Sequence, residues 1–68
     1  MSRKSDYVFY IGAELDWVHG WDPDVVIKMV PRLRRKSNQQ LAQLLTALKS
    51  ADNVAALDEL YHIKQGVI

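Results

Sequence analysis

The chain has no cysteine in its 68 residues. A domain of this length buries only about 60% of the surface that its unfolded chain exposes, so the margin of its stability is small. Disulfide bonds and thiolate-bound zinc, which support many domains of this size, are excluded by the missing cysteine. Dense apolar packing and self-association are the remaining means of stabilisation. We therefore expect one small domain that forms a homodimer.

Apolar and aromatic residues make up 49% of the chain, which has only two prolines and three glycines. This composition is typical of a folded domain and not of a disordered segment. No apolar run approaches the roughly 18 residues of a membrane span, and residues 7–11 are too few for the apolar core of a signal peptide. We expect a cytoplasmic protein without a membrane partner.

Residues 37–48 carry the clearest helix signals. Ser37, followed three positions later by Gln40, matches the sequence pattern of a capping box. A stripe of leucines with helical spacing follows, formed by Leu41, Leu44, Leu45 and Leu48. This spacing places the four leucines on one face and predicts an amphipathic helix.

A fourth helix is expected between Asp52 and Gly66. Asp52 or Asn53 can cap its start, and Gly66 can end it. The apolar side chains that we expect to face inward are Val54, Leu57, Leu60 and Tyr61. Their spacing again follows one face of a helix.

A second helix is predicted from about residue 23 to residue 30. Asp22, Pro23 and Asp24 combine an N-cap acid, a proline at the first helical position and a second acid near the positive end of the helix dipole. Lys28 is the only polar residue in the rest of this segment, so we expect the helix to be buried on most sides. Pro31 is expected to end or kink it.

Residues 7–11 allow two interpretations. Their aromatic and β-branched side chains favour a strand. Helical spacing is shown by Val8, Ile11, Leu15 and Val18. We favour the helix, which would run to His19 and be ended by Gly20 in a left-handed conformation, with Trp21 packing over its last turn.

The predicted fold class is therefore all-α. We expect a compact bundle of about four short helices formed by residues 6–68, preceded by a flexible basic tail at residues 1–5. The alternative is an α+β domain in which a strand at residues 7–11 pairs with residues 63–68.

Charge is segregated along the chain. Residues 25–50 contain six lysines or arginines and no acid, whereas acids outnumber bases in both flanks. The cations that form a candidate phosphate-binding surface are Lys28, Arg32, Arg34, Arg35 and Lys36. Such a cluster can contact nucleic-acid phosphates. The competing interpretation is a solvent-exposed turn whose cations pair with the acidic flanks.

The third predicted helix has no charged residue from Ser37 to Leu48. Interface cores are depleted of charge, so the side of this helix opposite the leucines is a candidate partner surface. Its residues are Gln39, Gln43 and Thr46. Trp17 and Trp21 are candidate anchors, because exposed tryptophans are frequent hot spots of protein interfaces. The alternative is a monomer with its own core and a neutral surface.

The sequence offers little for catalysis or metal binding. Four possible metal ligands lie close together, namely Asp16, His19, Asp22 and Asp24. Capping and solvation explain these residues without a metal. His62 lies in the last turn of the fourth predicted helix, where the helix dipole favours a cation. We expect no catalytic residue, metal, cofactor or small-molecule substrate.

The function expected from these features is binding. We interpret the chain as a small non-enzymatic protein-interaction module, an adaptor, regulator or inhibitor of a larger macromolecule, that acts as a dimer. The alternative is a nucleic-acid-binding protein that uses residues 28–36.

Overall fold

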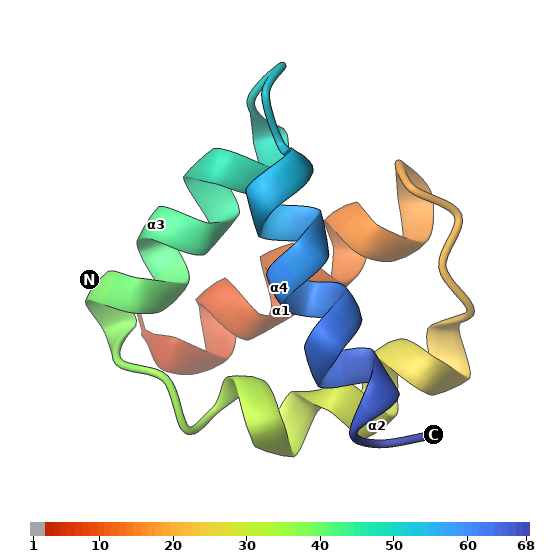
Figure 1. Cartoon of the computed structure of the whole chain (residues 1–68). Helices are drawn as coiled ribbons and strands as arrows, with labels where there is room; N and C mark the ends of the chain where they lie inside the picture. The colour runs from red at the N-terminus through yellow and green to blue at the C-terminus, as the bar shows by residue number, and fades with distance from the viewer. Residues whose placement is uncertain (1–2) are drawn as a thin grey trace.

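The computed structural model describes residues 3–68, and within them the chain forms four α-helices and no strand (Figure 1). The helices are α1 (Lys4–Trp17), α2 (Pro23–Leu33), α3 (Asn38–Lys49) and α4 (Val54–Gln65). The all-α expectation is confirmed, and the strand alternative for residues 7–11 is wrong. Lys4 and Ser5, which were expected in the tail, belong to α1, whereas Met1 and Ser2 lie outside the described residues.

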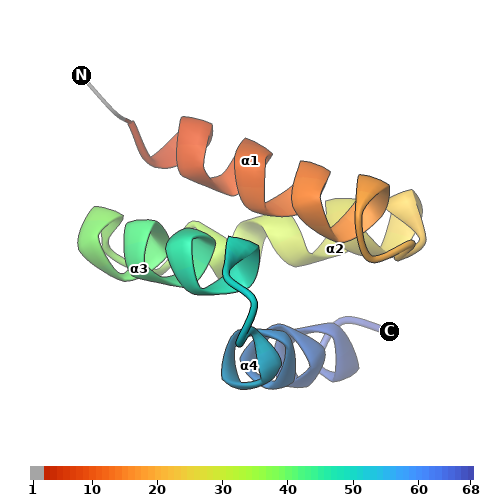
Figure 2. The same cartoon turned by 90° about the horizontal axis from the view of Figure 1, so that it is seen from above.

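The helices form three layers. Helices α2 and α3 lie in the middle, α1 packs on both of them from one side, and α4 packs on both from the other (Figure 2). A turn of five residues, 18–22, joins α1 to α2, so these two helices run in opposite directions. The C-terminal end of α1 therefore lies beside the N-terminal end of α2.

The core is made of eleven buried apolar side chains, and every helix contributes to it. They are Val8, Ile11, Leu15, Val26, Met29, Leu33, Leu41, Leu44, Leu48, Ala56 and Leu60. No polar or charged residue of the described chain is buried with them. The leucine stripe of α3 enters this core as expected, except that Leu45 lies at its edge and is only partly buried. Apolar packing is thus the main source of stability.

Helix α4 is rotated relative to the sequence-based expectation. Ala56 and Leu60, four residues apart, define its buried face, and Leu57 lies at the edge of the core. Val54 and Tyr61, which were expected to face inward, are exposed. Tyr61 lies one residue beyond Leu60, which corresponds to about 100° around the helix, and Val54 lies on the same side two turns earlier.

Helix α2 is longer and less buried than expected. It continues through Pro31 to Leu33, although proline was expected to end or kink it. Pro31 and Ile27, the residue whose carbonyl loses its helical donor, are both exposed, so the gap in the hydrogen bonding lies on the solvent side. Buried Leu33 fixes the last turn in the core. Only one face of α2 is buried, which corrects the expectation that it is buried on most sides.

The expected helix starts at Asp22 and Ser37 are confirmed. The Asp22 carboxylate accepts a hydrogen bond from the backbone N–H of Asp24 at 2.9 Å. Ser37 Oγ accepts from the backbone N–H of Gln40 at 3.1 Å, and Gln40 Oε1 accepts from the backbone N–H of Ser37 at 2.9 Å. These reciprocal bonds form the capping box of α3.

Two glycines were expected to end helices, and only one has the left-handed conformation. Gly20 has φ +70° after α1, and the next residue, Trp21, donates its backbone N–H to the carbonyl of Leu15 at 3.0 Å. Gly66 ends α4 in a right-handed conformation. Asn53 occupies the N-cap position of α4, without a side-chain capping bond.

Replacing Ser37 by alanine tests the capping box. We expect Ser37→Ala to lower the free energy of unfolding by about 1 kcal/mol, because a backbone donor of α3 loses its partner. The thermal midpoint, followed by circular dichroism, should fall by roughly 4–8 °C. Ser5→Ala, a change at an exposed serine inside α1, is the control. Equal midpoints for the two variants would contradict a stabilising role of the cap.

Candidate functional site

Exposed apolar side chains are concentrated on α1, α2 and the turn between them. Of the eight large apolar side chains that the structure describes as exposed, five lie there. They are Phe9, Tyr10, Trp17, Val18 and Ile27. Trp17 is 78% exposed, Ile27 66% and Phe9 63%. Because single exposed apolar residues are normal but clusters indicate interaction sites, this part of the surface is the leading candidate.

Three of these side chains flank a groove between α1 and α2, with a volume of about 300 Å³. Helix α1 contributes Val8, Phe9, Gly12, Ala13, Asp16 and Trp17, and helix α2 contributes Pro23, Val26, Ile27 and Val30. Asp16 is the only charged residue in this lining. We call this feature the α1–α2 groove. Its apolar walls are suited to apolar side chains of a protein.

The groove follows from the spacing of residues on the two helices. Phe9, Ala13 and Trp17 are four residues apart and form one row along α1, while Val8 and Leu15 turn into the core. Gly12 has no side chain, which allows α1 and α2 to approach each other closely at the floor of the groove. A Cβ at this position would lie 3.1 Å from Val26 Cγ1. The close approach of the helices at Gly12 leaves the larger side chains as the walls.

The aromatic side of the groove extends to Tyr10. The rings of Phe9 and Tyr10 lie edge to face, with their centroids 5.7 Å apart and an interplanar angle of 68°. This arrangement is one that aromatic pairs favour. It gives α1 a broad exposed aromatic surface.

The two tryptophans proposed as anchors differ in their surroundings. Trp17 lines the α1–α2 groove. Trp21 is partly buried against the core, and the Lys64 ammonium lies 5.1 Å from the centre of its ring. This cation–π contact connects the turn after α1 to α4. In this structure Trp21 therefore has a packing role, and Trp17 is the candidate anchor that is exposed.

The neutral surface of α3 is separate from the groove. Gln39, Gln43 and Thr46 are exposed, as expected for a solvent-facing side of the helix. Gln43 and Thr46 line a shallow depression with small neighbours on α3, and neither lines the α1–α2 groove. Thr46 Oγ1 donates to the carbonyl of Ala42 at 2.9 Å. Trp17 and these α3 residues therefore do not form one groove.

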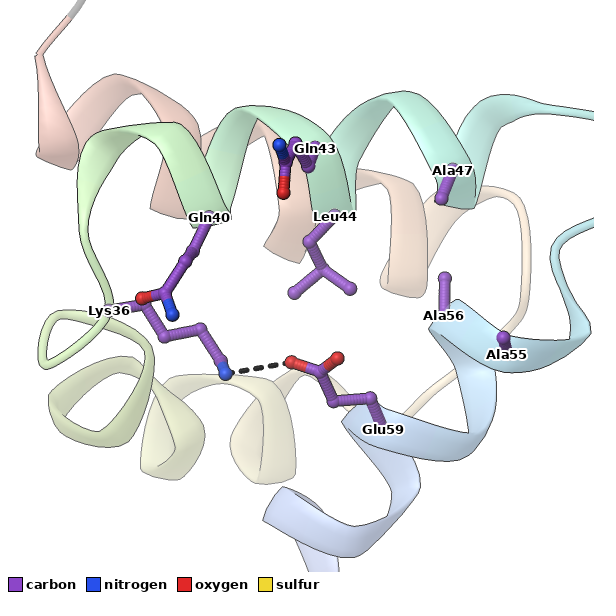
Figure 3. A pocket seen from close by; sticks show the side chains of 8 residues that line it. All are labelled: Lys36, Gln40, Gln43, Leu44, Ala47, Ala55, Ala56 and Glu59. Carbon is purple, nitrogen blue, oxygen red and sulfur yellow. Dashed lines mark ion pairs between the residues drawn. The ribbon is translucent and has the colours of Figure 1, made fainter.

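A second hollow lies between α3 and α4 and has a volume of about 560 Å³ (Figure 3). Its lining consists of Lys36, Gln40, Gln43, Leu44, Ala47, Ala55, Ala56 and Glu59. The Lys36 ammonium and the Glu59 carboxylate meet across it at 2.7 Å. Gln40 is engaged in the capping box. The charged groups of this hollow thus pair with each other.

The basic segment is partly used within the chain. Arg32 Nη2 donates to the carbonyl of Gly66 at 3.2 Å, and Lys36 pairs with Glu59. Both contacts hold α4 against the region where α2 ends. Lys28, Arg34 and Arg35 are exposed and form no ion pair with the described residues. The pairing of Lys36 with the acidic C-terminal flank agrees with the competing interpretation of this segment.

The acidic residues and histidines of residues 3–68 do not form a metal-binding cluster. No three His, Asp or Glu side chains there are placed to hold a metal ion. His19, which is close in sequence to Asp16 and Asp22, has a buried Nε2 without a hydrogen-bond partner in the structure. His62 Nδ1 lies 2.8 Å from the Asp58 carbonyl oxygen. None of the helices described combines the length and the apolar character needed to cross a membrane.

Comparison with known proteins adds no family. No family model matches the chain. No curated protein and no solved structure matches it either.

Sequence reasoning missed Phe9 and Ile27 as exposed residues. Ile27 was assigned to a helix that was expected to be buried on most sides, and Phe9 to an apolar run whose exposed residues were not identified. The available signal was their position relative to the core residues Val8 and Val26, because the next residue on a helix points about 100° away. On a helix with a single buried face, two adjacent apolar residues cannot both point to the centre of that face.

The ion pair across the α3–α4 hollow gives a salt-dependent prediction. Glu59→Gln should lower the free energy of unfolding by less than about 1 kcal/mol, because both partners are partly exposed to solvent. In roughly 1 M NaCl the Debye length is about 3 Å, so the difference from wild type should become smaller. Urea unfolding at low and high salt measures this difference in the free energy of unfolding. Asp52→Asn, at an exposed residue that forms no ion pair with the described residues, is the control, and a deficit that is unchanged in high salt would contradict the electrostatic origin.

Proposed function

We propose that this chain is a protein-interaction module that binds apolar side chains of a protein partner in the α1–α2 groove. The observation that carries the proposal is the exposure of Phe9, Trp17 and Ile27 around one apolar groove. The core of the domain is already complete without them. Their exposure has a free-energy cost in water, and burial against a partner would remove it.

The gain expected from each of these side chains is large. Burying one large apolar side chain contributes about 1.5–3 kcal/mol, and tryptophan is enriched among interface hot spots. Three such side chains on two packed helices form a surface with little conformational entropy to lose. This preorganisation favours affinity.

The nucleic-acid alternative has less support. Its candidate surface contains five cations, of which Arg32 and Lys36 already contact α4. Lys28, Arg34 and Arg35 remain exposed. Because nucleic-acid affinity depends on the number of phosphates that cations contact, a surface reduced in this way favours weaker binding. This alternative is one outcome of the experiment below.

Affinity capture from a cell lysate, with and without nuclease, tests the proposal. We expect wild type to retain a protein after nuclease treatment, and Trp17→Ser and Ile27→Ser each to lower the retained amount at least about tenfold, as loss of a hot spot does. Val54→Ser is the matched control, because Val54 is 73% exposed but lies outside the groove. Circular dichroism of each variant verifies that the helices are intact.

Two results would contradict the proposal. If Val54→Ser loses the retained protein as strongly as Trp17→Ser does, the groove is not the binding surface. If capture disappears with nuclease and with Arg34→Glu, while Trp17→Ser has no effect, the chain binds nucleic acid through the basic segment.

A further inference from the structure

We infer that the partner that occupies the α1–α2 groove is a second copy of this chain, docked about a twofold axis with its groove running in the opposite direction. This inference rests on the proposed function, because it needs the groove to be a protein-binding surface. The arguments are the charges at the two ends of the groove and the spacing of its aromatic residues.

One end of the groove is acidic. Asp16 lies in the last turn of α1 and lines the groove. Asp22 caps α2, and Asp24 lies in the first turn of that helix. Because the turn of residues 18–22 joins the two helices at this end, the three acidic residues lie at the same end of the pair.

The other end is basic. Arg34 and Arg35 follow the last residue of α2, and Lys4 begins α1. Asp6, in the first turn of α1, is an acid at this end. The three bases outnumber it, and the end therefore has a net positive charge. Arg34 is seven residues after Ile27 and therefore continues its row along α2 toward this end. The charge thus changes along the groove, from negative at the end with the 18–22 turn to positive at the end where α2 stops.

A twofold axis through the middle of the groove reverses this direction in the second copy. The acidic end of each copy then faces the basic end of the other, and the same attraction occurs twice. Docking with the grooves in the same direction would place acid on acid and base on base. The charge pattern is therefore complementary to itself in the antiparallel arrangement only.

The aromatic row of α1 has the same symmetry. Ala13 lies midway between Phe9 and Trp17, four residues from each. If two α1 helices cross near Ala13 in opposite directions, Trp17 of one copy lies over Phe9 of the other. The small side chain of Ala13 permits close approach at the axis, and the two aromatic contacts lie on either side of it. In an isologous interface, contacts occur in such reciprocal pairs.

Sedimentation equilibrium of the purified full chain, from low to high micromolar concentration, tests the inference. Wild type is expected to approach twice the monomer mass of 7.8 kDa at high concentration. Trp17→Glu and Ile27→Glu should each remain monomeric and helical, because both residues are exposed and lie outside the core. Gln43→Glu, on the separate neutral surface of α3, is the matched control and should remain dimeric.

A charge exchange tests the antiparallel direction. Asp16→Arg alone and Arg34→Asp alone should each raise the dimer dissociation constant roughly tenfold or more at low salt, because each places like charges together. The double variant brings opposite charges together again at these two positions and should recover part of the lost affinity. Two losses that simply add in the double variant would overturn this orientation.

The remaining outcomes separate this inference from the proposed function. A wild-type monomer at high micromolar concentration overturns the second copy as occupant. A dimer that Gln43→Glu dissociates, but Trp17→Glu does not, overturns it as well, because the α3 surface is then the interface. In either case, a protein captured from the lysate in a Trp17-dependent manner still supports the groove as a binding surface. Loss of that capture as well contradicts both proposals.

Discussion

The burial of eleven apolar side chains in one cluster is the constraint on which the rest of the structure depends. The chain has no disulfide bond, so the four helices are held mainly by this packing. Helices α2 and α3 can meet both outer helices only because each directs one apolar stripe into the shared cluster. Apolar side chains outside these stripes remain on the surface, and on α1 and α2 they collect around one groove. The candidate site is thus a consequence of how the core is built.

The helices and their starts could be predicted because the signals are local. The Ser37–Gln40 capping box and the Asp22-Pro23 start depend on residues two or three positions apart, and both formed as expected. The rotation of α4 could not be predicted in the same way. Val54 and Tyr61 fit an apolar stripe as well as Ala56 does, and only packing against α2 and α3 decides which side turns inward.

The candidate site was predictable in part, for a related reason. Trp17 was identified from its residue type, whereas Phe9 and Ile27 were assigned to apolar runs whose helical rotation was not known. Trp21 shows the limit of residue type as evidence, because its ring packs on the core and under Lys64. Sequence shows that a side chain is apolar, but tertiary packing decides whether it stabilises the domain or stays free for a partner.

The charges of the chain have two different roles, which the net charge of +1 conceals. Lys36 and Arg32 are directed to α4 and contribute to holding the third layer in place. Asp16 and Arg34 lie at opposite ends of the α1–α2 pair and are not used in this way. The dipole of α2 favours acids at the start of that helix and bases at its end, whereas Asp16 lies in the last turn of α1, where the dipole does not favour an acid. Because long-range charge patterns direct association, the separation of charge along the apolar groove agrees with the binding role that we propose for this surface.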